Sequence, residues 1–141
     1  MRLSRFAFIA GALVLMTAGL SAQDKPEVAA QKTAESWLAL IDAGKYADSY
    51  DAASDEFKAQ LTKEKWVEMA KGARGGTGAF ESRKLVNALY TENIPNAPPG
   101  KYVALTFQAK YAGGTATEQI VSINEKDQSW RPIGYVISPL Q

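Results

Sequence analysis

The chain has 141 residues, with 16 Lys and Arg side chains against 15 Asp and Glu, and it has no His and no Cys. The absence of His and Cys excludes histidine-dependent catalytic triads, cysteine nucleophiles, ordinary zinc sites and haem ligation by His. Because the charge is nearly balanced, the basic excess typical of nucleic-acid-binding proteins is missing, and we expect no nucleic-acid partner.

The first residues have the pattern of a secretory signal peptide. Two arginines near the start are followed by an uncharged, mostly apolar stretch at 6–20 and then by small residues, which predicts cleavage near Ala22. An uncleaved anchor is the alternative, but a membrane-spanning helix needs about 20 apolar residues and this stretch is shorter. We therefore expect a signal peptide at 1–22, a single domain at 23–141, a periplasmic location, and no membrane association after cleavage.

The first half of the expected domain carries apolar residues at helical spacing. Residues 27–43 predict an amphipathic helix that ends at Gly44. Further helices are expected to begin near Lys45, after Ser54 and after Thr62, because Ser and Thr are favoured N-cap residues. The apolar pattern of the last helix predicts a buried side made of Trp66, Met69, Ala70 and Ala73.

From residue 80 onward the period changes from helical to two, which indicates β-strands. The expected strands, joined by tight or polar turns, lie at 80–91, 102–111, 115–124 and 129–137. In the third strand, Val121 and Ile123 are predicted to point into the core. Helices followed by an antiparallel meander predict an α+β fold, with the helices packed on one face of a curved sheet of about four strands.

Three motifs along the chain carry a family resemblance. They are the segment from Trp37 to Phe57 with its Ile41-Asp42, Gly44 and Ser49-Tyr50, the connection from Ile94-Pro95 to Tyr102, and the ending Trp130-Arg131-Pro132-Ile133-Gly134-Tyr135. Together they resemble the bacterial family called domain of unknown function 4019. The resemblance covers nearly the whole expected domain. It implies an exported protein and the architecture of the domain, but no activity. Pro132 departs from the family's pattern and predicts an edge strand or a bulge.

A second resemblance concerns the fold alone. The order of helices and a strongly bent meander sheet is similar to the cone-shaped superfamily that includes nuclear transport factor 2 and ketosteroid isomerase. That superfamily contains enzymes, ligand-binding proteins and dimerisation modules, so the resemblance does not select a function.

A candidate active site combines Asp42, Tyr46 and Tyr50. A carboxylate acting as general base and a tyrosine hydroxyl that stabilises an oxyanion would suit proton abstraction next to a carbonyl. In the alternative interpretation, the tyrosine rings pack in the core and Asp42 caps a helix or faces water. The sequence thus leaves open a small isomerase-like or hydratase-like enzyme.

Two further patterns favour structural roles. Asp48, Asp51 and Asp55 lie three and four residues apart, but they lack the alternating ligands and central glycine of a calcium loop, so we expect a solvated face and no metal. The glycine-rich segment at 72–78 follows a helix, whereas phosphate-binding loops precede one. We therefore expect a helix cap and a connection there, and no cofactor.

The preferred functional hypothesis is a non-enzymatic periplasmic module that binds a small apolar ligand or a partner protein. Its candidate binding residues are Trp130, Arg131 and Tyr135, because an aromatic edge beside a cation can meet an acidic or aromatic group. Trp37 and Trp66 lie on apolar helical stripes and are expected in the core. A homodimer formed through the exposed face of the sheet is a third hypothesis.

Overall fold

Four helices precede four strands in the computed structural model, which describes residues 24–141. The elements are α1 (Pro26–Asp42), α2 (Tyr46–Ala52), α3 (Asp55–Gln60), α4 (Lys63–Arg74), β1 (Phe80–Thr91), β2 (Tyr102–Tyr111), β3 (Gly114–Asn124) and β4 (Trp130–Ile137). The expected signal peptide lies outside the described residues. None of the helices in residues 24–141 has the length and hydrophobicity needed to cross a membrane.

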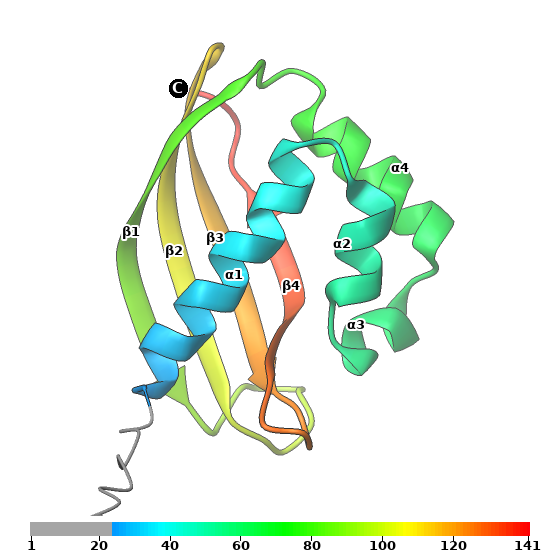
Figure 1. The fold of residues 1–141 in the computed structure, drawn as a ribbon, viewed down its shortest axis with the longest axis vertical. Coiled ribbons are helices and arrows are strands. Elements are labelled where there is room, and N and C mark those ends of the chain that lie inside the picture. Colours follow the sequence, from blue (N-terminus) through cyan, green and yellow to red (C-terminus); the bar gives the residue numbers. More distant parts are fainter. Residues whose placement is uncertain (1–23) are drawn as a thin grey trace, which may run out of the picture.

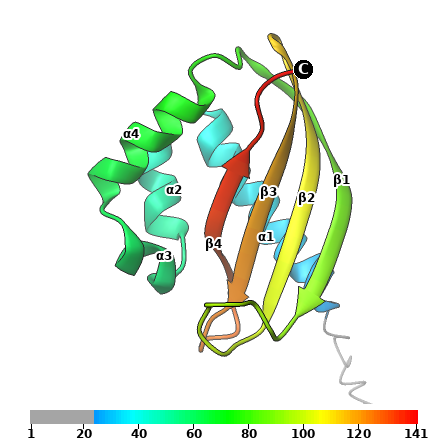
Figure 2. The ribbon, with the colours of Figure 1, turned by 180° about the vertical axis from the view of Figure 1, so that it is seen from behind.

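The strands form one antiparallel sheet in the order β1-β2-β3-β4. Helix α1 runs diagonally across one face of this curved sheet, and α2, α3 and α4 lie beside α1 on the β4 side (Figure 1). Seen from behind, the opposite face carries no helix of the described residues (Figure 2). The predicted α+β class, with helices on one face of a curved four-stranded sheet, is therefore confirmed.

The predicted helix boundaries are confirmed by their capping contacts. After α1, Gly44 adopts a φ of 75°, a left-handed conformation that glycine tolerates because it has no Cβ. The hydroxyl of Ser54 accepts a hydrogen bond of 3.0 Å from the N–H of Phe57 at the start of α3. The hydroxyl of Thr62 accepts one of 3.3 Å from the N–H of Lys65 at the start of α4.

The buried side of α4 differs from the prediction. Trp66 and Ala70 are buried as expected, but Met69 is 51% exposed and Ala73 is also exposed. The third buried position is taken by Arg74, which follows Ala70 by four residues. The helix thus packs through a narrow i, i+4, i+8 stripe, and a charged residue occupies the end of that stripe.

The predicted orientation of β3 is wrong. Val121 and Ile123 lie on the outer face, and the buried residues of β3 are Ala116, Glu118, Ile120 and Ser122. These four pair with the buried positions of β2, namely Ala109, Phe107, Leu105 and Val103. Because two of the four inward residues are polar, the alternation of polarity along β3 does not mark its buried face.

Pro132 lies in an edge strand beside a bulge, as predicted. The register of the β3–β4 pair shifts between Val121 and Ser122, so that these residues pair with Gly134 and Pro132. At the free edge, the carbonyl oxygen of Pro132 accepts a hydrogen bond of 2.9 Å from the N–H of Ser54. This bond attaches the segment between α2 and α3 to β4, and it places the end of α2 next to the start of β4.

Candidate functional site

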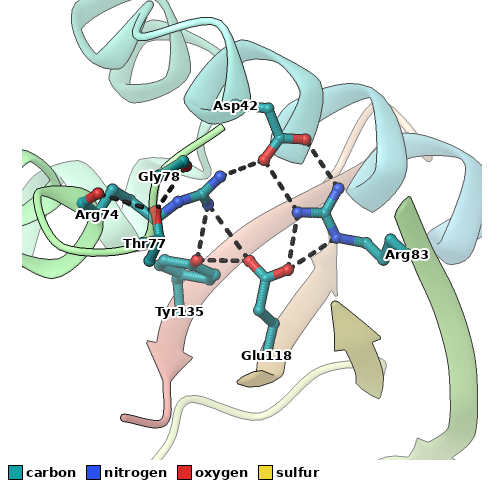
Figure 3. A network of polar contacts seen from close by, with 7 residues as sticks. All are labelled: Asp42, Arg74, Thr77, Gly78, Arg83, Glu118 and Tyr135. Carbon is teal, nitrogen blue, oxygen red and sulfur yellow. Dashed lines mark hydrogen bonds and ion pairs between the residues drawn. The ribbon is translucent and has the colours of Figure 1, made fainter. Parts of the chain in front are cut away.

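Four charged side chains are buried together on the helix side of the sheet. We call Asp42, Arg74, Arg83 and Glu118 the charge cluster. Their side chains are 10%, 5%, 8% and 0% exposed, in that order. They converge from the ends of α1 and α4 and from β1 and β3 (Figure 3). Charged side chains are rarely this deeply buried unless they are paired.

Both arginines of the charge cluster contact both carboxylates. Arg83 lies 2.8 Å from Asp42 through Nη1 and 2.7 Å from Glu118 through Nη2, and its Nε also donates to Glu118 at 2.8 Å. Arg74 donates a short hydrogen bond to Asp42 and lies 3.4 Å from Glu118. The four charges sum to zero, and every carboxylate oxygen accepts from at least one guanidinium N–H.

Tyr135 of β4 completes this network. Its hydroxyl donates to Glu118 at 2.5 Å and accepts from Arg74 at 3.1 Å. Burial, and next the charge of Glu118, raises the pKa of Tyr135, so the hydroxyl remains a donor at neutral pH. For Arg83, burial by itself lowers the pKa, but the hydrogen bonds to Asp42 and the charge of Glu118 outweigh that effect and raise it.

Tyr111 packs against the charge cluster without joining its hydrogen bonds. The guanidinium carbon of Arg74 lies 4.8 Å from the centre of the Tyr111 ring, within the range of a cation–π contact. Burial and the nearby charge of Glu118 raise the pKa of Tyr111 to about 12. Within residues 24–141 its buried hydroxyl has no hydrogen-bond partner.

The geometry of the charge cluster indicates a structural role. Each carboxylate accepts hydrogen bonds from both guanidinium groups, so its oxygens are already occupied by donors. Four pockets found over residues 24–141 are lined by other residues. The cluster therefore holds the ends of α1 and α4 to the sheet.

A groove of about 670 Å³ lies between α1, α2 and β4, within the size range of small-molecule sites. Its apolar residues are Trp37, Leu40, Ala52, Trp130 and Pro132. Its polar residues are Lys32, Thr33, Ser36, Asp51 and Arg131. The groove thus combines an apolar lining, including two indole rings, with two cationic side chains and one carboxylate.

Buried hydrogen bonds and ring stacking fix the side chain of Trp37, which lines this groove. The indole N–H of Trp37 donates to the carbonyl oxygen of Ser49 at 2.7 Å, and that of Trp66 donates to the Ser49 hydroxyl at 2.9 Å. The two indoles stack with their ring centres 5.6 Å apart. These bonds fix the Trp37 ring, which is 2% exposed, as the rigid floor of the groove.

The three candidate catalytic residues do not form a joint hydrogen-bonded site. Asp42 belongs to the charge cluster, and within residues 24–141 no hydrogen bond joins it to Tyr46 or Tyr50. The Tyr50 hydroxyl donates to the carbonyl oxygen of Leu61 at 2.9 Å, and Tyr46 packs half-buried against the core. Their predicted catalytic role stays a prediction.

The three candidate binding residues are divided between the two features. Trp130 and Arg131 line the groove, whereas Tyr135 lies in the charge cluster. Trp130 is 9% exposed, against 2% for Trp37 and 4% for Trp66. Among residues 24–141 no group of three potential ligand side chains is arranged to hold a metal ion, and Asp51 is paired with Lys63 at 2.7 Å.

Sequence reasoning missed Arg74, Arg83 and Glu118. A signal for two of them is present, because a charged residue continues an apolar pattern. Arg74 continues the spacing of Trp66 and Ala70, and Glu118 alternates with Ala116 and Ile120 on the buried face of β3. A charge in phase with core residues predicts a buried partner of opposite sign.

The comparisons with known proteins concern the family alone. No curated protein matches the chain. The model of the family described as a protein of unknown function, DUF4019, matches residues 33–135, which include most of the groove and both carboxylates of the charge cluster. Since this match spans more than half of the sequence, the chain belongs to the DUF4019 family.

Proposed function

We propose that the protein is an exported, non-enzymatic binding module whose ligand occupies the groove between α1, α2 and β4. The observation that carries the proposal is the lining of this groove, where the edge of Trp130 lies beside the exposed cationic side chains of Lys32 and Arg131. Small-molecule sites combine such an apolar lining with a few polar groups that orient the ligand.

An isomerase-like or hydratase-like enzyme has less support. The carboxylate of Asp42 accepts hydrogen bonds from Arg74 and Arg83, which occupy both of its oxygens. The Tyr50 hydroxyl is engaged by a main-chain carbonyl. A general base needs a free lone pair within reach of the substrate proton, and the described pockets do not reach Asp42.

The location and the wider relationship of the protein are part of the same proposal. The charged start, apolar stretch and small residues before position 23 support export to the periplasm with cleavage near Ala22. The order of helices and strands supports a relationship to the cone-shaped superfamily of nuclear transport factor 2. Such a relationship is compatible with a binding role, although the fold by itself does not select it.

Native mass spectrometry of protein released gently from a bacterial periplasm tests the proposal. We expect cleavage near Ala22 and an added mass from a retained ligand. Ala52→Trp, which fills the groove from α2, should abolish the added mass. The matched control is Ala47→Trp, an exposed alanine of the same helix that does not line the groove, and it should retain the ligand.

Two results would contradict this proposal. A retained mass that persists in the Ala52→Trp variant would place the ligand elsewhere. A bare protein whose tryptophan fluorescence also fails to respond to a library of apolar carboxylates, amines and alcohols would argue against ligand binding altogether. In that case capture of a partner protein becomes the relevant experiment.

Self-association is a second candidate function, supported by the outer face of the sheet. Two adjacent cross-strand rows there contain no charged residue: Leu89, Ala104, Val121 and Gly134 in one, and Asn87, Thr106, Gln119 and Val136 in the other. Leu89 is 58% and Val136 is 63% exposed. Depletion of charge is typical of interfaces, and the same native spectrum reports whether a dimer forms.

A further inference from the structure

We infer that the groove selects an anionic amphiphile, a molecule with an apolar aromatic or aliphatic body and one anionic group at its end. This inference rests on the proposed function and names its ligand class. The anionic group is a carboxylate, sulfonate or phosphate, which share charge and hydrogen-bond acceptor character.

The available polar groups of the groove are donors. Lys32 and Arg131 contribute positive charge and N–H groups from opposite walls, one on α1 and one on β4. Trp130 lies next to Arg131, and within residues 24–141 no hydrogen bond of its indole N–H is found, unlike those of Trp37 and Trp66. A ligand whose end carries acceptors and negative charge complements the two cations.

The acceptors of the groove are mostly engaged or weak. The carboxylate of Asp51 lies 2.7 Å from the ammonium group of Lys63. The hydroxyls of Thr33 and Ser36 donate their hydrogens to helix carbonyls at 3.0 and 3.1 Å, so they offer only uncharged lone pairs. The Asp51–Lys63 pair is as exposed as the pairs of the two cations, so a cationic ligand would find one available carboxylate but would also meet two cations of its own sign.

The present partners of the two cations are exchangeable. Lys32 pairs with Asp24, and the side chains are 66% and 49% exposed. Arg131 pairs with Asp127, and the side chains are 37% and 60% exposed. Ion pairs at this exposure contribute little to stability, so an anion in the groove can replace or share these partners at little cost.

The apolar part of the groove requires an apolar ligand body. Trp37 and Pro132 are almost fully buried beneath the groove, so a ligand meets the edge of Trp130, which is 9% exposed, and the more exposed side chains of Leu40 and Ala52. A strongly polar body would lose its hydration there without gaining hydrogen bonds. Apolar body and anionic end are both needed to match the groove.

A matched pair of fluorescent probes tests this inference. 8-Anilinonaphthalene-1-sulfonate has an apolar aromatic body with one sulfonate, and N-phenyl-1-naphthylamine is the same skeleton without the anion. Fluorescence titration of the folded protein should give one sulfonate probe per chain, bound about ten-fold more tightly than the neutral probe, because a charge-assisted hydrogen bond contributes roughly that factor. The Ala52→Trp variant should abolish binding of both probes.

Removal of the two cations should affect only the anionic probe. The double variant Lys32→Gln with Arg131→Gln is expected to weaken the sulfonate probe about ten-fold and to leave the neutral probe unchanged. Lys84→Gln, an exposed lysine of β1 outside the groove, is the control and should leave both affinities unchanged. Equal urea midpoints will establish that all variants are folded.

Each contrary result identifies what fails. Equal affinities of the two probes, both lost in Ala52→Trp, would overturn the ligand class and leave the groove as a binding site. An equal loss of sulfonate affinity in Lys84→Gln would show that binding follows overall charge, which also overturns the inference. Probe binding that Ala52→Trp does not change, or no binding of the sulfonate probe at all, would overturn the inference and the proposed function together.

Discussion

The charge cluster and the groove both contain paired cationic and carboxylate side chains, but those of the cluster are buried and those of the groove are exposed to solvent. In the charge cluster, the four side chains are at most 10% exposed and each arginine contacts two carboxylates. In the groove, Lys32 and Arg131 are 66% and 37% exposed and each has one carboxylate partner. The buried charges of the cluster stabilise the fold, because removing one partner leaves an uncompensated buried charge. The solvent-exposed charges of the groove, each with one carboxylate partner, remain available to a ligand.

The largest expected effect on stability comes from the loss of one buried charge in the charge cluster. Glu118→Gln preserves the size of a side chain that is 0% exposed, but it leaves Arg74 and Arg83 with a single carboxylate. Removal of one partner from a buried ion pair costs about 3–5 kcal/mol. We expect a decrease of that size in the free energy of unfolding measured by urea denaturation.

The matched control for this prediction is Glu81→Gln. Glu81 is also a strand glutamate paired with a cation, Lys110, but the pair is separated by 3.6 Å and its side chains are 45% and 65% exposed. Its loss should cost less than about 1 kcal/mol. Equal effects of the two substitutions would show that burial of the charge cluster does not distinguish it from a surface pair.

Alkaline pH is expected to have a smaller effect on stability, through the tyrosines that pack against the charge cluster. Tyrosine in the unfolded chain has a pKa of about 10, whereas the pKa of Tyr111 in the folded protein is raised to about 12, first by burial and then by Glu118. Since the folded state holds its proton more tightly, this stabilisation is fully present below pH 10 and is lost as the pH rises from 10 to 12. The raised pKa of Tyr135 adds a loss in the same direction.

The expected loss from Tyr111 is roughly 2–3 kcal/mol over that interval, measured as urea unfolding at pH 9 and above. Tyr111→Phe isolates its contribution. The substitution removes a hydroxyl that has no partner within residues 24–141, so stability at pH 8 should change little, and the decrease above pH 10 should become shallower. An unchanged decrease would show that other groups, including the lysines, cause the alkaline loss.

The sequence predicts the secondary structure better than it predicts the site, for physical reasons. Caps such as Ser54 and Thr62 act within three residues, and the period of β2 is set by local alternation, so both are visible in the sequence. The placement of Trp130 beside Arg131 at an edge strand also follows from local signals, Pro132 among them.

The charge cluster could not be predicted in the same way. Asp42 lies 32 residues from Arg74 and 41 residues from Arg83, and Glu118 lies 44 residues from Arg74. Which of the 16 cations faces which carboxylate depends on how α1 and α4 pack over the sheet. The wrong orientation predicted for β3 concealed Glu118 as well, because a strand with polar residues on both faces has no distinct apolar phase.

The smallest expected effect on stability comes from removing a cation that lines the groove. Arg131→Gln removes an exposed ion pair with Asp127 at 3.4 Å, and we expect the free energy of unfolding to change by less than about 0.5 kcal/mol. Arg83→Gln, the same substitution in the charge cluster, should cost several-fold more, because two buried carboxylates lose their main partner. Urea denaturation of both variants in one buffer gives the ratio directly. If Arg131→Gln proved as destabilising as Arg83→Gln, the cation in the groove would be a structural element, and it could not exchange its partner for a ligand without unfolding the start of β4.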